Sequence, residues 1–131
     1  MKFAQRVFLV AGIFGVVVLA PMYFLEDFLS RQFPPAITHP EFYYGFVGTV
    51  FAWQLVYLVI SRDPARYRPM MLLAILAKAS FGLAVFVLVA LGRVPALPAL
   101  AAAIDLVFAV LFACAYVATG RIGQRPAVSD R

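Results

Sequence analysis

Long runs of apolar residues alternate with short polar segments along the whole chain. The runs lie at about residues 7–25, 42–60, 70–92 and 97–119, and few polar side chains interrupt them. A helix needs about 20 mostly apolar residues to cross the roughly 30 Å hydrocarbon core of a bilayer. Because these runs are apolar on all sides rather than in alternation, they exclude a membrane-spanning barrel and predict four helices.

The composition indicates the same class. Of the 131 residues, 65% are hydrophobic and 13% are charged, and the mean hydropathy is +0.96. A soluble domain has roughly 25% charged residues, so an ordinary water-soluble or disordered chain is excluded. We expect one all-α domain over residues 1–131, an integral membrane four-helix bundle. The single Cys and single His exclude a disulfide framework, a cysteine-based zinc site and a pair of histidine haem ligands.

The basic residues are distributed unequally between the segments that flank the apolar runs. Eight lie in the N-terminal segment, the second connection and the C-terminal tail, whereas the first and third connections carry two. Because basic residues mark the cytoplasmic side, we expect both termini to be cytoplasmic. The net charge of +5 is then a topology signal, and no nucleic-acid partner is expected. The eight are Lys2, Arg6, Arg62, Arg66, Arg68, Arg121, Arg125 and Arg131, and the two are Arg31 and Arg93.

Two charged residues interrupt the apolar runs. Lys78 lies in the third run and Asp105 in the fourth, where a charge costs roughly 2.5–3.5 kcal/mol on insertion scales. Lys78 lies about 12 Å from the cytoplasmic end of its helix, and Asp105 lies about 12 Å from the outer end of its helix. Across roughly 30 Å of hydrocarbon, their Cα atoms then differ in depth by about 6 Å or more. A direct ion pair then requires helix tilt or a bridging water. The alternatives are that Lys78 extends to the cytoplasmic surface, or that Asp105 is protonated at a tight helix contact.

Other polar side chains match these two charges in depth. Gln54 lies close to the level of Lys78, Thr49 lies close to that of Asp105, and Ser80 lies near mid-span. We expect a polar cluster inside the bundle. Trp53, next to Gln54, either packs within the bundle, which is the commoner outcome, or lines an apolar cavity. Such a cluster is either a set of packing contacts between helices, at about 0.6 kcal/mol each, or an anchor for a ligand or a proton. The candidate residues are Thr49, Trp53, Gln54, Lys78, Ser80 and Asp105.

Little in the sequence suggests an enzyme, and no catalytic residue, cofactor or metal site is predicted. In the first connection, His39 lies near Glu26, Asp27 and Glu41, which together could suggest a metal site. Glu41 also suits a helix N-terminus, and acidic residues are expected on the outer side, so we predict no metal ion there. In an enzyme of this type, the two charges within the spans would transfer protons, because no other titratable group lies as deep.

The most distinctive local motifs are HPEFYYGF at 39–46, the pair Trp53–Gln54, DPARYRP at 63–69, Lys78, and IDL at 104–106. They resemble a group of small uncharacterised bacterial membrane proteins with four helices, and the likeness covers nearly the whole chain. That group is similar, more distantly, to DoxX-like proteins in span number, size and the placement of Lys and Asp. The resemblance implies a four-helix fold in the bacterial cytoplasmic membrane. DoxX-like proteins include membrane subunits linked to sulfur-compound oxidation and redox stress, but this chain has no cysteine pair for that chemistry.

Two functions from different classes remain open. The first is a non-enzymatic subunit or accessory protein, which would assemble with another membrane protein or with further copies of itself. The short connections favour it, because they leave almost no soluble surface. The alternative is an intramembrane binding protein, or an enzyme, for a small hydrophobic molecule such as a lipid, quinone or isoprenoid, since bundles commonly hold ligands between helices. A transporter is the third, and without an inverted repeat it would have to oligomerise.

Overall fold

The computed structural model describes residues 1–33 and 35–123, and side chains up to residue 120. The predicted cytoplasmic residues Arg125 and Arg131, and the side chain of Arg121, lie outside the described residues. Within them every regular element is helical, and four helices are long and apolar enough to span a membrane, as the hydrophobic pattern predicts. The elements are α1 (Lys2–Leu19), the 3₁₀-helix η1 (Ala20–Phe24), α2 (Glu26–Gln32), α3 (Pro40–Arg62), α4 (Arg68–Ala90) and α5 (Pro98–Gly123).

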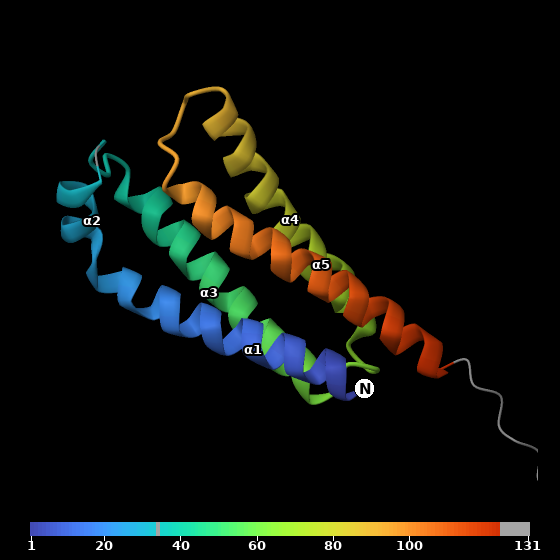
Figure 1. The fold of residues 1–131 in the computed structure, drawn as a ribbon. Coiled ribbons are helices and arrows are strands. Elements are labelled where there is room, and N and C mark those ends of the chain that lie inside the picture. The colour runs from blue at the N-terminus through green and yellow to red at the C-terminus, as the bar shows by residue number, and fades with distance from the viewer. Residues whose placement is uncertain (34, 124–131) are drawn as a thin grey trace, which may run out of the picture.

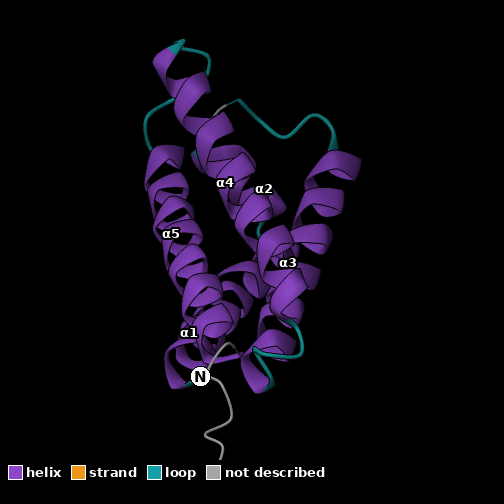
Figure 2. Cartoon of the chain, turned by 90° about the vertical axis from the view of Figure 1, so that its right-hand side faces the viewer, coloured by secondary structure: helices purple, strands orange, loops and turns teal. Residues whose placement is uncertain are grey.

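The four long helices form a bundle of two antiparallel pairs. α1 packs along α3, α4 packs along α5, and the pairs meet chiefly where α1 contacts α5. α3 and α4 contact each other only slightly. Figures 1 and 2 show that the helices converge at the end where the chain begins, the N-terminal end, and diverge toward the opposite end, the α2 end. The start of α1, the α3–α4 turn and the end of α5 all lie at the N-terminal end (Figure 1).

Proline and glycine define the ends of the helices. A proline occupies the first or second position of α3, α4 and α5, where its missing N–H removes no helical hydrogen bond. α4 ends before Gly92, whose φ of 65° lies in the left-handed region. The N–H groups of Gly92 and Arg93 donate to the carbonyls of Val89 and Leu88, both at 2.9 Å. This is a Schellman cap, and it turns the chain sharply out of α4.

The first apolar run differs from the predicted span at both ends. α1 begins at Lys2 rather than near residue 7, and its α-helical part ends at Leu19 rather than near residue 25. Pro21 has no N–H to continue the α-helical bonding, and the chain tightens into η1. The Tyr43 hydroxyl of α3 donates to the Met22 carbonyl of η1 at 2.7 Å. The connection that follows also contains the short helix α2, where the sequence predicted only a loop.

Aromatic side chains fill the N-terminal half of the bundle. Phe8 of α1 stacks on Phe112 of α5 with ring centroids 4.2 Å apart, and Tyr57 of α3 packs edge-on against Phe112 at 5.0 Å. Buried side chains from the long helices complete this core, which holds the two helix pairs together at the N-terminal end. They are Ala4, Ala11, Ile60, Met71, Ala74 and Ala115.

Glycine allows close contact within each helix pair. Gly12 of α1 lies against Leu58 of α3, and Gly82 of α4 lies against α5. A Cβ at position 82 would come within 2.6 Å of the Leu106 side chain and 3.1 Å of the Ala102 carbonyl oxygen. Small residues at such positions let helix backbones approach closely. The α4–α5 contact therefore depends on a missing side chain at Gly82.

Gly82→Leu is expected to lower the thermal unfolding midpoint of the detergent-purified protein, because the new side chain overpacks the α4–α5 contact at a cost of about 1–3 kcal/mol. Gly45→Leu is the matched control, since Gly45 is exposed and nothing lies within 4 Å of the position its Cβ would take. Equal midpoints for the two variants would contradict the packing assigned to Gly82.

Candidate functional site

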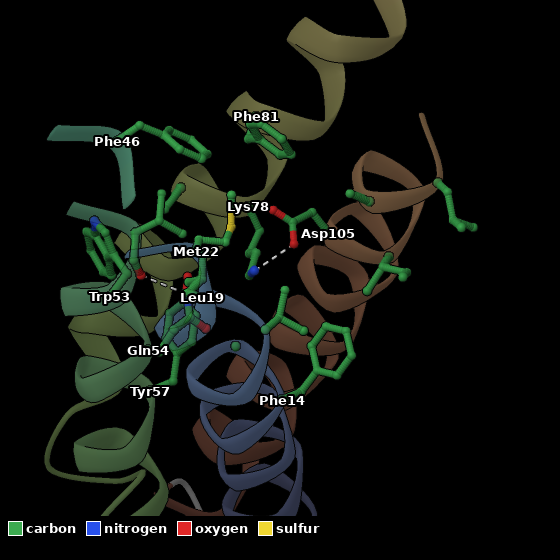
Figure 3. A pocket seen from close by; sticks show the side chains of 17 residues that line it. Phe14, Leu19, Met22, Phe46, Trp53, Gln54, Tyr57, Lys78, Phe81 and Asp105 are labelled. Atoms are coloured by element: carbon green, nitrogen blue, oxygen red, sulfur yellow. Dashed lines mark hydrogen bonds and ion pairs between the residues drawn. The ribbon is translucent and has the colours of Figure 1, made fainter. Parts of the chain in front are cut away.

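A cavity of about 430 Å³ lies between the four long helices. It occupies the part of the bundle that the aromatic core leaves open, and residues of α1, η1, α3, α4 and α5 line it. Small-molecule sites have volumes of roughly 300–1,000 Å³, so the cavity is large enough for a ligand. Figure 3 shows that aromatic side chains surround an ion pair within it. The aromatic lining residues are Phe14, Phe46, Trp53, Tyr57 and Phe81.

Lys78 of α4 and Asp105 of α5 form a direct ion pair in this cavity (Figure 3). Lys78 Nζ lies 2.6 Å from Asp105 Oδ1, and the two side chains are only 10% and 19% exposed. Such a short separation is characteristic of a charge-assisted hydrogen bond. Of the alternatives that the sequence left open, the structure shows the direct ion pair. Lys78 does not extend to the cytoplasmic surface.

The stagger of α4 and α5 reduces the depth difference only slightly, and the length of the lysine side chain allows the pair to form. α4 extends beyond the start of α5, and the connection at 91–97 runs back (Figures 1 and 2). Gly82 lies opposite Ala102 and Leu106. Lys78, one turn earlier in α4, is then about 5 Å from the level of Asp105. The long lysine side chain covers that distance.

Aromatic rings lie close to the Lys78 ammonium. Its Nζ is 5.8 Å from the ring centroids of both Tyr57 and Phe108, within the range over which a ring attracts a cation. The two opposite charges of the pair balance each other inside the apolar wall. A single charge left without its partner in such surroundings is strongly unfavourable. Lys78 and Asp105 therefore act as one unit.

Gln54 of α3 has a buried acceptor that no described group satisfies. Its side chain lines the cavity, and the residue is 1% exposed. Nε2 donates to the Val50 carbonyl at 2.8 Å, whereas Oε1 has no hydrogen-bond partner among the described residues. A carbonyl can only accept, so this contact determines which amide atom is nitrogen. Gly15 of α1 leaves the space that the amide oxygen occupies.

Four of the six predicted cluster residues line the cavity, namely Trp53, Gln54, Lys78 and Asp105. The prediction was wrong for Thr49 and Ser80, which are exposed. The Ser80 hydroxyl donates to the Ala77 carbonyl of its own helix at 3.1 Å. Equal depth along the helix was not enough to predict whether these side chains point inward, because the direction of a side chain around the helix axis also matters. Thr49 precedes Gln54 by five residues, which turns it by about 140° around α3.

Apart from Trp53, the aromatic residues of the cavity wall were not predicted from the sequence. Tyr57 follows Gln54 by three residues in α3, and Phe81 follows Lys78 by three residues in α4. Residues three apart share a helix face, so this spacing from the two polar residues was a usable signal. Phe14 of α1 offered no such signal, because it lies among apolar residues only.

The cavity approaches the outer surface of the bundle at two sides. Phe46 of α3 and Phe81 of α4, with ring centroids 5.7 Å apart, flank it where these two helices barely touch. Leu100 of α5 and Phe14 of α1 line it on another side, and 66% and 41% of their surfaces are exposed. The side chains at both places are apolar, as expected for openings that face hydrocarbon rather than water.

The acidic residues of the first connection form no comparable site. His39 and Glu41 lie 3.3 Å apart on the surface. Within the described ranges, no three His, Cys, Asp or Glu side chains are placed to hold one metal ion.

Comparison of the chain with protein-family models, with curated proteins and with solved structures finds no match. The resemblance to small four-helix bacterial membrane proteins and to DoxX-like proteins therefore stays a prediction. The site itself offers an apolar enclosure and a balanced ion pair.

Lys78→Met and Asp105→Asn are each expected to lower the free energy of unfolding by about 3–5 kcal/mol, because each leaves the other residue without its partner. The double variant should lose much less than the sum of the two single losses. Unfolding in mixed micelles with increasing SDS would measure all four proteins as a double-mutant cycle. Losses that simply add would show that the two side chains do not act as a pair.

Proposed function

We propose that this protein lies in a membrane and binds a small hydrophobic molecule between its helices. The observation that carries the proposal is the cavity of about 430 Å³ between the four long helices. A volume of this size suits a small molecule. The ion pair and the aromatic walls support the same function, since mostly apolar pockets with a few polar groups are typical of ligand sites.

The proposal includes an orientation in the membrane. The basic side chains of Lys2, Arg6, Arg62, Arg66 and Arg68 belong to segments that lie together at the N-terminal end of the bundle (Figure 1). Positive charge favours the cytoplasmic side, so this end is assigned to the cytoplasm and the α2 end to the outside. The likeness to bacterial proteins in the sequence motifs supports placing the chain in the bacterial cytoplasmic membrane. The cavity then opens to the lipid in the outer half of the bilayer.

Binding is favoured over catalysis and over a purely structural role. Lys78 and Asp105 satisfy each other at 2.6 Å, and a proton acceptor or donor for a reaction would need to be free. A cluster that only fixes helix register would need no open volume beside it. A role as an accessory subunit, which is the first of the two functions that the sequence suggests, is an outcome of the test below.

Native mass spectrometry of the protein, extracted gently from its own membrane, is expected to show a retained small hydrophobic molecule. Ala77→Phe should remove most of the bound molecule, because Ala77 lines the cavity and the new ring fills it. Ala84→Phe is the matched control on the same helix, since Ala84 is exposed and lies outside the cavity; it should retain the molecule.

A molecule retained equally by both variants, or retained by neither wild type nor control, would contradict the proposal. A second polypeptide in fixed stoichiometry, with the cavity empty, would favour the accessory-subunit function instead. Topology is checked separately, by labelling single cysteines introduced at Arg66 and Arg93 in intact cells of a Cys114→Ser background. The proposed orientation requires labelling from outside at position 93 alone.

A further inference from the structure

We propose that the ion pair is the polar anchor of the cavity and that the bound molecule is a neutral lipid with a free hydroxyl group. The hydroxyl donates a hydrogen bond to Asp105 Oδ2 and accepts one from Lys78 Nζ. This inference rests on the proposed binding function and names the chemical class of the ligand. An open carboxylate oxygen beside spare ammonium N–H groups, in one apolar enclosure, carries it.

Asp105 offers an accessible acceptor. Lys78 Nζ donates to its Oδ1, whereas Oδ2 accepts no hydrogen bond from the described residues. Within those residues, Gln54 Oε1 is the only side-chain N or O atom that is both fully buried and without a partner. Asp105 Oδ2 therefore keeps exposed surface. Because Asp105 lines the cavity and points into it (Figure 3), a molecule in the cavity can donate to this oxygen.

Lys78 offers donors next to that acceptor. An ammonium group carries three N–H donors, and in the described part of the chain only Asp105 accepts from it. Lys78 also lines the cavity. Since Nζ and Oδ1 are 2.6 Å apart, the spare N–H groups and Oδ2 lie within reach of one small polar group. A hydroxyl both donates and accepts, whereas an ether only accepts and a hydrocarbon does neither.

The balanced charge of the pair favours a neutral group. A carboxylate would compete with Asp105 for Lys78, and an amine would compete with Lys78 for Asp105. Either would leave an unbalanced charge inside the apolar wall, which is strongly unfavourable. A hydroxyl leaves the pair intact. Hydrogen bonds to charged groups are also stronger than those between neutral groups, so one hydroxyl at this place makes a large difference to binding.

The walls favour an apolar chain. Phe14, Phe46 and Phe81 bring aromatic surface to the cavity, and the exposed Leu100 lies at its edge. A chain longer than the cavity passes between α3 and α4, where the two helices barely touch. The hydroxyl then lies at the ion pair, and the chain extends sideways into the lipid.

Trp53 provides the test, because it is the only tryptophan and it lines the cavity. The full-length protein in phosphatidylcholine vesicles is titrated with bromododecane, which quenches tryptophan on contact. Dodecanol, dodecyl methyl ether, dodecanoic acid and dodecylamine then compete at equal mole fractions in the bilayer, and recovery of the Trp53 emission measures each. The alcohol is expected to compete about tenfold better than the ether, and better than the acid and the amine.

A double variant tests the anchor. Lys78→Met with Asp105→Leu replaces both charges by apolar side chains and leaves neither without a partner. The alcohol and the ether should then compete equally, with the ratio taken within that variant. Ser80→Ala is the matched control, since Ser80 is exposed on the same helix and lies outside the cavity wall. It should keep the alcohol preference of the wild type.

The outcomes separate the two proposals. Quenching that does not saturate, or that is the same in Ala77→Phe, overturns the binding function itself. Saturable quenching with equal competition by alcohol and ether in the wild type, as expected if only water meets the ion pair, overturns the ligand class alone. Stronger competition by the acid or the amine, or an alcohol preference that survives in the double variant, also overturns it. The wild-type comparison needs no variant to fold.

Discussion

The Lys78–Asp105 pair is the constraint on which the interior of this protein depends. Two charges in an apolar bundle have to meet, and at 2.6 Å they do so between neighbouring helices. The long lysine side chain covers the remaining difference in depth, and the missing side chain at Gly82 lets α4 and α5 approach closely. The pair also determines what lies beside it. Rings of Tyr57 and Phe108 shield the ammonium, and a cavity with balanced charge remains on the other side.

The cavity exists because the two helix pairs are joined at one end only. Within each pair, glycine brings the backbones close at Gly12 and Gly82. Between the pairs, the stacked rings of Phe8 and Phe112 fill the N-terminal half, and the described residues form no equivalent core in the half toward α2. The space left there is bounded by four helices, so it has walls from distant parts of the chain. The cavity and the aromatic core thus occupy opposite halves of the same helix bundle.

Much of this arrangement was predictable from the sequence. Helix number, helix type and the inward position of Gln54, Lys78 and Asp105 follow from hydrophobic runs and from the cost of polar groups in lipid. Thr49 and Ser80 were misplaced because depth along a helix does not give direction around it. The ion pair was one of the alternatives that the sequence left open, since no local pattern encodes the offset between α4 and α5. The break at Pro21 was not predicted, because the apolar run continues beyond it.

The Schellman cap at Gly92 and the short connection after it have a consequence for how the chain is made. They join α4 and α5 as a hairpin, so the two charges are close neighbours in sequence terms and meet at a low cost in loop-closure entropy. A hairpin that enters a bilayer with Lys78 and Asp105 already paired carries no net charge into the hydrocarbon. A helix that entered alone would carry one unpaired charge. With the proposed location in a membrane, insertion of the last two spans together would keep both charges paired.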